Sequence, residues 1–243
     1  KTIELSKKLL QEMKTTQFLE AMWSGKVVNI TENRQALHPA LRGSRDSFFP
    51  KDIMNEVTKQ KKQMLKIAEG VRNGNIKSHS GKKYTSVLAI GIGGSDLGPR
   101  MSVKALTPFK SNIDVRFVSN IDPSDLINVT ADLDPSKTLI IVSSKTFTTV
   151  ETLANAKAAF NWLAKNIGEI GAKNQQYAIT SNFDNAKKFG FDATKILLFS
   201  EWVGGRTSIW SSVGLPLAIS IGEKLFKEFL LGGYSLDKHM KNE

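Results

Sequence analysis

From Tyr84 onward, short apolar runs alternate with stretches of helical periodicity, and this alternation constrains the fold more than any other feature. The runs are apolar throughout, as expected when helices cover both faces of a parallel sheet. Strand–helix alternation at this spacing predicts a layered α/β fold with right-handed crossovers. The expected strands are 86–90, 115–118, 138–142, 177–180 and 196–199, and the expected helices lie near 96–106, 124–130, 150–166 and 183–189.

The first 80 residues have a different pattern. Apolar residues recur at helical spacing over residues 5–18 and again over 53–71. The second stretch follows Phe49-Pro50, which places proline in the first turn of a helix, where its missing N–H costs nothing. Residues 78–81, Ser-His-Ser-Gly, are typical of a linker. We therefore predict a helical N-terminal segment over 1–80 and an α/β domain over 81–243.

Composition and charge limit the class of protein. The chain has no cysteine and no apolar stretch long enough for a membrane-spanning helix, so neither disulfides nor a membrane partner is expected. No secretory signal pattern precedes the first helix, which favours a cytoplasmic location. The net charge is +11, and residues 1–83 carry 17 Lys+Arg against 8 Asp+Glu, a difference of +9. Because no RNA-binding or zinc motif accompanies this excess, a solvated helix face is favoured over a nucleic-acid partner.

The loop after the first expected strand is rich in glycine and reads Gly91-Ile92-Gly93-Gly94-Ser95-Asp96. Glycines allow the backbone to approach a ligand closely, and a helix beginning at Ser95 would offer free N–H groups to an anion. The loop is not a Walker A motif, because no Gly-Lys-Ser/Thr follows, and Asp96 occupies the third glycine position of a dinucleotide fingerprint. An NAD-binding loop is therefore disfavoured, and a tight turn without a ligand is the structural alternative.

The loop after the third expected strand, residues 143–149, contains five hydroxyl side chains and Lys145. A phosphate monoester needs several converging hydrogen-bond donors and positive charge, and this loop supplies both. An ordinary Ser/Thr-rich capping loop is the alternative. Two phosphate-compatible loops on strands that could be neighbours favour the phosphate site.

A third unusual stretch, residues 201–214, contains Gly204-Gly205-Arg206. Paired glycines leave room beside the backbone, and Arg206 follows them at the expected start of another helix. An arginine in that place could stabilise an oxyanion without changing its protonation state. A surface salt bridge is the more common role of a single arginine.

These stretches resemble the glucose-6-phosphate isomerase (phosphoglucose isomerase) family, which has the sugar-isomerase (SIS) type of fold. The resemblance implies a three-layer α/β/α sandwich with a mainly parallel sheet, preceded by a helical N-terminal segment. The matching segments, in the family's order, are 31–34, 37–38, 40–42, 91–99, 120–123, 144–149 with Glu151, 201–214 and 230–240.

The resemblance also implies a reaction. Members of the family interconvert glucose 6-phosphate and fructose 6-phosphate, in glycolysis and gluconeogenesis, through a cis-enediol(ate) and without a metal or cofactor. By resemblance, Arg206 would stabilise the enediolate and Glu151 would help to orient the ring-opening histidine. Gly93, Gly94 and Gly205 would bring the backbone close to the substrate. The substrate phosphate would be held by Ser95, Ser144, Lys145, Thr146 and Thr149.

The sequence departs from the family pattern in three respects. Thr207 stands where an aromatic residue is usual, and Val150 where glutamine is usual. Family members also continue well beyond the equivalent of Glu243. In the family, a second SIS domain follows there. It carries the proton-transferring glutamate, the ring-opening histidine and a late lysine. None of the histidines in this sequence, His38, His79 and His239, matches the catalytic histidine. We therefore expect the chain alone to bind a sugar phosphate without turning it over, and the intact protein to be a homodimer.

A non-catalytic SIS-type domain that binds a sugar phosphate and regulates a partner is the alternative from another functional class. The basic front segment suits it. The Gly204-Gly205-Arg206 sequence argues against it, since a sensor needs no group to stabilise an enediolate.

Overall fold

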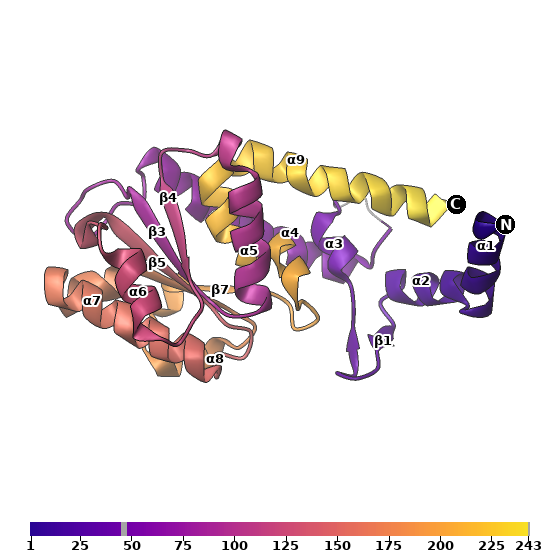
Figure 1. Cartoon of the computed structure of the whole chain (residues 1–243), viewed down its shortest axis with the longest axis horizontal. Coiled ribbons are helices and arrows are strands. Elements are labelled where there is room, and N and C mark those ends of the chain that lie inside the picture. Colours follow the sequence, from indigo (N-terminus) through magenta and orange to yellow (C-terminus); the bar gives the residue numbers. More distant parts are fainter. Residues whose placement is uncertain (45–47, 243) are drawn as a thin grey trace.

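The computed structural model describes residues 1–44 and 48–242, and a five-stranded sheet lies at its centre (Figure 1). The strands are ordered β4-β3-β5-β6-β7, and every neighbouring pair is parallel. Each strand ends within one residue of its predicted bounds, so the predicted α/β class is confirmed. The strands are β3 (Ser86–Ile90), β4 (Asp114–Val118), β5 (Thr138–Ser143), β6 (Gln176–Thr180) and β7 (Ile196–Leu198).

Helices cover both faces of the sheet, which confirms the three-layer sandwich (Figure 1). Alternate residues of β5 show how the layers are joined, because Leu139 and Ile141 enter one core and Ile140 and Val142 enter the other. The first core lies under α4 (Lys51–Asn73), α5 (Gly94–Ala105) and α9 (Leu215–Asn242). The second lies under α6 (Pro123–Thr130), α7 (Val150–Asn174) and α8 (Phe183–Phe189).

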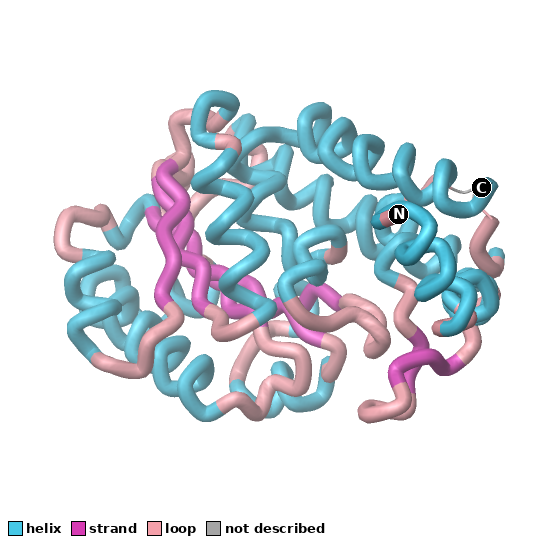
Figure 2. Tube along the Cα trace, turned by 45° about the vertical axis from the view of Figure 1, so that its right-hand side comes forward, coloured by secondary structure: helices cyan, strands magenta, loops and turns pink. Residues whose placement is uncertain are grey.

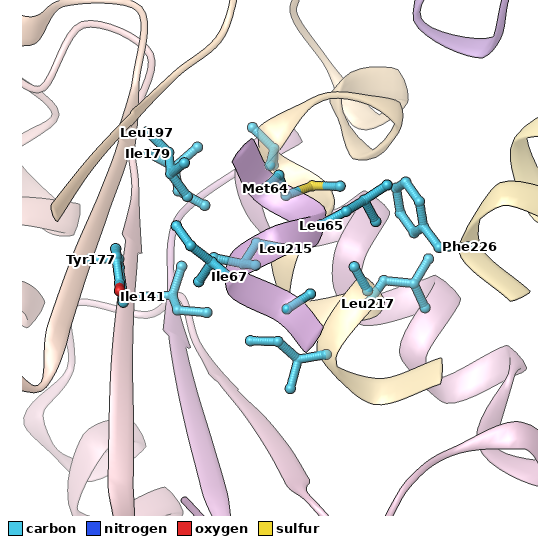
Figure 3. Close-up of a cluster of buried hydrophobic side chains, with 14 of the residues drawn as sticks. Met64, Leu65, Ile67, Ile141, Tyr177, Ile179, Leu197, Leu215, Leu217 and Phe226 are labelled. Carbon is cyan, nitrogen blue, oxygen red and sulfur yellow. The ribbon is translucent and has the colours of Figure 1, made fainter. Parts of the chain in front are cut away.

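Helix α4 packs against both the sheet and α9. Figure 3 shows Ile67 of α4 beside Ile141 of the sheet, with Phe226 of α9 on the far side of α4. Met64, Ile141 and Phe226 are fully buried, and burial of side chains of this size is the main source of stability in such a core. The helix therefore shares the core of the sheet. The division of the chain at residue 80 stays a prediction.

The front of the chain forms two short helices, a hairpin and a further helix: α1 (Thr2–Glu12), α2 (Thr15–Trp23), β1 (Val27–Asn29), β2 (Arg34–Gln35) and α3 (His38–Arg42). Figures 1 and 2 show α1 and α2 beside the end of α9 and away from the sheet. The expected helical stretch is broken at Lys14, whose φ is 51°. Its apolar side chains, Leu5, Leu9, Leu10, Met13 and Phe18, are each at least 52% exposed. The antiparallel β1–β2 pair was not predicted.

Other differences from the sequence predictions are local. Pro50 caps α4 and stands one residue before its first turn. Helix α7 continues past the predicted end to Asn174, through a kink at Gly168, where φ is 76°. In the predicted linker segment, the backbone N–H of His79 donates to Gln175 Oε1 at 3.0 Å. None of the described helices has the length and apolar character needed to cross a bilayer.

A buried ion pair ties α3 to the second half of α9. Arg42 Nε donates to Asp237 Oδ2 at 2.9 Å, and the two side chains are only 11% and 6% exposed. The guanidinium carbon of Arg42 also lies 3.9 Å from the ring centre of Trp210. A buried charge needs its partner, so each side chain depends on the other.

Replacing one partner of this pair should therefore destabilise the chain strongly. We expect Arg42→Ala to lower the free energy of unfolding by about 3–5 kcal/mol, because Asp237 is left buried and uncompensated. The double variant R42M/D237L should lose less than R42A, since an apolar pair of similar volume removes both charges. Urea denaturation measures the two values. A double variant as unstable as R42A would contradict this account.

Candidate functional site

The candidate site lies where the order of strands reverses. From β3 the chain passes to β4 on one side of it and then returns to β5 on the other side. In open parallel sheets, ligands bind outside the carboxyl ends of the strands at such a switch point. A pocket of about 180 Å³ is found at this place, between the loops that follow β3, β5 and β7. These are the three loops that the sequence singled out.

The structure brings most of the predicted site residues together. The pocket is lined by Gly94, Ser95, Ser144, Lys145, Thr149 and Gly205.

Four predicted residues lie next to the pocket without lining it. Gly93, with φ 57°, caps α5, and Thr146 is exposed, with its hydroxyl 2.7 Å from that of Thr148. Glu151 is the second residue of α7 and is half-buried. Arg206 is exposed and begins a 3₁₀ helix, Arg206–Trp210, where an ordinary helix was expected. It forms no salt bridge with any carboxylate in the described part of the chain.

Hydrogen bonds to β6 and its loop fix the phosphate-compatible loop 143–149. The carbonyl oxygen of Lys145 accepts from Ser181 N at 3.0 Å, Ser181 Oγ at 2.9 Å and Thr180 Oγ1 at 2.9 Å. The backbone N–H of Ser144 donates to Ile179 O at 3.0 Å. These bonds restrain the backbone on both sides of the Lys145 Cα atom, so the position from which its side chain extends is fixed.

Phe147 anchors the same loop from the other side. Its φ is 54°, a backbone conformation that a bulky side chain rarely adopts. The ring is 2% exposed and packs edge-on against Phe189 and Phe191, at centroid distances of 5.8 and 5.5 Å. The aromatic contacts hold the loop in a strained form, which is common at binding sites.

The N-terminus of α7 is aimed at the pocket and is not capped by a side chain. Thr149 is the N-cap residue, but its hydroxyl accepts from Ser144 Oγ at 3.3 Å and makes no bond to the first turn. The first-turn N–H groups and the positive end of the helix dipole are therefore available to an anion.

Lys145 adds a cation at this place. Burial lowers the pKa of its ammonium group, and the positive charge of Arg34 lowers it further, whereas Glu32 and Glu201 act in the opposite direction. A bound phosphate would favour the charged form. The geometry and the charge of the pocket both suit a phosphate group.

The backbones of Gly94 and Gly205 are in contact at one side of the pocket, where the loop after β3 meets the loop after β7. A Cβ atom on Gly94 would lie 2.5 Å from the carbonyl carbon and oxygen of Gly205. Real Cβ atoms do not approach backbone so closely, so this contact requires glycine. The need for Gly94 is therefore steric, in addition to any role in binding.

Residues of the front segment hold the Gly204-Gly205 loop. His38 Nε2 lies 3.0 Å from Gly204 N and 2.9 Å from Gly204 O, and Arg34 Nη1 donates to Glu201 O at 3.0 Å. Burial lowers the pKa of His38. A hydrogen bond that the protonated Nε2 would donate to Gly204 O raises the pKa, whereas the charges of Arg42 and Lys145 lower it. The ring is therefore neutral at pH 7, and its Nε2 can accept from the Gly204 N–H.

Seven residues of the pocket were not named as site residues from the sequence, although five of them lie in the three predicted loops. They are Ile92, Ser143, Thr152, Phe199, Val203, Gly204 and Ser208. One signal was present for Thr152, because it follows Thr149 by three residues and so shares a face of the helix. Phe199 ends an apolar run and carried no signal. Among the described residues, no cluster of three or more His, Asp or Glu side chains could hold a metal ion.

The contact between Gly94 and Gly205 predicts that alanine destabilises the chain at position 94 but not at an open glycine position. We expect Gly94→Ala to lower the free energy of unfolding by about 1–3 kcal/mol, because the added methyl group overpacks the backbone. The matched control is Gly232→Ala in α9, where a Cβ meets nothing within 4 Å. It should raise stability by about 0.5–1 kcal/mol, as expected for alanine in a helix. Thermal denaturation of both variants tests this, and a neutral G94A would contradict it.

The lowered pKa of His38 predicts that stability falls on acidification. The unfolded chain binds the proton near the ordinary pKa of 6.5, and the folded chain only at lower pH. Between these values the unfolded state holds more protons, so the contribution of His38 is complete above pH 6.5 and is lost as the pH falls toward the folded pKa. His38→Gln, whose side-chain oxygen can still accept from Gly204 N–H, should show a shallower decline. Thermal unfolding of both forms across this range measures the difference, and an H38Q variant with the same pH dependence as the unaltered chain would contradict the prediction.

A family model and individual relatives agree on the identity of the chain. The model described as phosphoglucose isomerase matches residues 1–243. The chain is 44% identical over 242 residues to a glucose-6-phosphate isomerase of Rhizobium leguminosarum bv. trifolii, covering 98% of this chain and 45% of the relative. It is 46% identical to one of Caulobacter sp. strain K31, covering 91% of this chain and 42% of the relative. The chain thus spans a little less than half the length of these relatives.

Solved structures give the same result. The crystal structure of a glucose-6-phosphate isomerase from Chlamydia trachomatis matches with a TM-score of 0.80 and 27% identity, covering 96% of this chain and 45% of that chain. A hypothetical protein of Thermus thermophilus, 23% identical with a TM-score of 0.68, shares the fold. The family predicted from the motifs is confirmed: the chain belongs to the phosphoglucose isomerase family.

Proposed function

We propose that this chain supplies the phosphate-binding part of an enzyme that interconverts glucose 6-phosphate and fructose 6-phosphate. The observation that carries the proposal is the convergence of Lys145, several hydroxyl groups and the uncapped N-terminus of α7 on one pocket. The names of the relatives supply the sugar and the reaction.

The pocket has the groups that a phosphate monoester needs. Ser95, Ser144 and Thr149 offer hydroxyl donors from two loops, and Lys145 offers a charged donor. The first-turn amides of α7 add donors that cost no side-chain entropy. Thr146 is proposed as a further ligand on the exposed side of the same loop. Together these groups would fix one end of the sugar, which orients the carbons that react.

Two residues beside the pocket are proposed to act in the reaction. Interconversion opens the sugar ring and moves a proton between C2 and C1 through an enediolate. Arg206 has no carboxylate partner in the described part of the chain, so its guanidinium can stabilise the negative charge of that intermediate. Glu151, next to the pocket in the first turn of α7, is proposed to orient the histidine that opens the ring.

Proton transfer needs groups that this pocket does not contribute. Its described lining consists of hydroxyl, glycine and apolar residues with one lysine. A carboxylate or imidazole is the usual acid–base group for such a step. We therefore propose that these groups belong to a second SIS domain, that the intact protein is a cytoplasmic homodimer acting in glycolysis and gluconeogenesis, and that residues 81–243 form the first SIS domain.

The proposal predicts selective binding that depends on Lys145. In an NMR titration, this chain should bind glucose 6-phosphate and fructose 6-phosphate and not NAD. Lys145→Met should weaken binding by about tenfold to a hundredfold, as expected for loss of a charge-assisted hydrogen bond. Lys104→Met, at an exposed position in the last turn of α5, is the matched control and should bind like the unaltered chain.

Other outcomes would count against the proposal in different ways. Binding of NAD without binding of sugar phosphates would contradict the substrate class. Turnover by the chain alone, in a coupled isomerase assay, would contradict the division of labour between two domains. Sugar-phosphate binding by a longer form of the protein that has no isomerase activity would favour the regulatory alternative.

A further inference from the structure

Thr152 is a buried residue of the pocket wall. It is the third residue of α7 and is 2% exposed. It lines the same pocket as Ser144, Lys145 and Thr149. Its side chain is therefore shielded from solvent although it lines the pocket.

The hydroxyl of Thr152 has no hydrogen-bond partner. In the described part of the chain, only two buried side-chain polar atoms lack a partner, Trp23 Nε1 and Thr152 Oγ1. Buried polar groups are nearly always bonded, so each exception requires an explanation. Trp23 belongs to the separate core of the front segment. Thr152 lines the candidate site.

Other buried or half-buried helical threonines show how such a hydroxyl is usually satisfied. Thr58 Oγ1 donates to Met54 O at 2.6 Å, and Thr130 Oγ1 donates to Leu126 O at 2.8 Å. Both use the carbonyl four residues earlier in the same helix, the common solution for threonine. For Thr152 that position falls before the first residue of α7, in the loop. The start of the helix therefore leaves the hydroxyl without this intrahelical acceptor.

The hydroxyls nearest in the sequence already have partners. Ser144 Oγ donates to Thr149 Oγ1, and the hydroxyls of Thr146 and Thr148 bond each other. The Thr152 hydroxyl and the first-turn amides of α7 therefore join the Lys145 ammonium and the Thr149 O–H as donors on this side of the pocket that have no acceptor among the described residues. All of these groups can donate, so the matching ligand group is an acceptor with several oxygens.

We infer that the Thr152 hydroxyl donates a hydrogen bond to a phosphoryl oxygen of the bound sugar phosphate, which makes it a binding residue of this site. The inference rests on the proposed function, since it uses the same ligand. It assigns a role to a residue outside the set expected from the family motifs. It also explains why a threonine that costs the unliganded chain stability stands at this position.

The inference predicts that removing the Thr152 hydroxyl weakens binding of glucose 6-phosphate without destabilising the unliganded chain. Thr152→Val keeps the shape and removes the unpaired hydroxyl. The melting temperature of the unliganded chain should therefore be unchanged or rise, because a buried unsatisfied group is lost. The affinity for glucose 6-phosphate should fall by about tenfold to a hundredfold, the usual effect of losing a hydrogen bond to a charged group. Thr152→Ser keeps the hydroxyl and should bind within a few-fold of the unaltered chain.

Thr130→Val is the matched control. It removes a buried helical hydroxyl that is bonded and lies in α6, outside the pocket. It should lower the melting temperature or leave it unchanged, and it should not alter the affinity. Calorimetric titration with glucose 6-phosphate and with inorganic phosphate measures affinity for all four chains. A loss in T152V for both ligands places the contact on the phosphate group.

The failures of the two proposals are distinguishable. If the unaltered chain binds glucose 6-phosphate and T152V binds it equally well, Thr152 is not a ligand and the proposed function stands. That result would mean that its hydroxyl is satisfied by an ordered water. If the unaltered chain binds neither glucose 6-phosphate nor inorganic phosphate, the proposed function and this inference both fail.

Discussion

The contact between the backbones of Gly94 and Gly205 determines the form of the site. It joins the loop after β3 to the loop after β7, although a large part of the chain separates them. A Cβ atom on Gly94 would lie 2.5 Å from Gly205, so any other residue would force the two loops apart. The loop after β5 lies between these walls and carries Lys145. The pocket therefore exists because two loops can approach without side chains, and its polar groups converge as a consequence.

The front segment also helps to fix the shape of the site, because it holds the loop that contains Gly205. Helix α1 buries no side chain, and α2 buries Trp23 but leaves Phe18 exposed. Their neighbours in the sequence, however, hold the backbone of the glycine loop through His38 and Arg34. Loops are mobile unless their backbone groups are bonded. Contacts from a segment more than 160 residues away thus restrict the loop that precedes Arg206.

The sequence predicts the sheet well because its signals are local. Uniform apolar runs mark buried parallel strands, and the carboxyl ends of such strands meet at one edge, which places Ser95, Lys145 and Gly205 together. What the sequence does not predict depends on contacts between distant segments. The positive φ of Phe147 follows from aromatic packing on Phe189 and Phe191. The β1–β2 hairpin and the role of His38 depend on where the front segment lies in space.

Three departures from local rules lie close together around the pocket. Asp122 and Asn182 cap their helices through side-chain bonds of 2.8 and 3.0 Å, as the first residues of helices usually do. Thr149 stands in the same position of a much longer helix and leaves its first turn uncapped. Phe147 and Thr152 add strain and an unpaired hydroxyl within five residues of each other. Each departure costs stability in the absence of a ligand, and a phosphate in the pocket would satisfy the exposed donors. Three such departures within six consecutive residues of one pocket are consistent with selection for binding at this site.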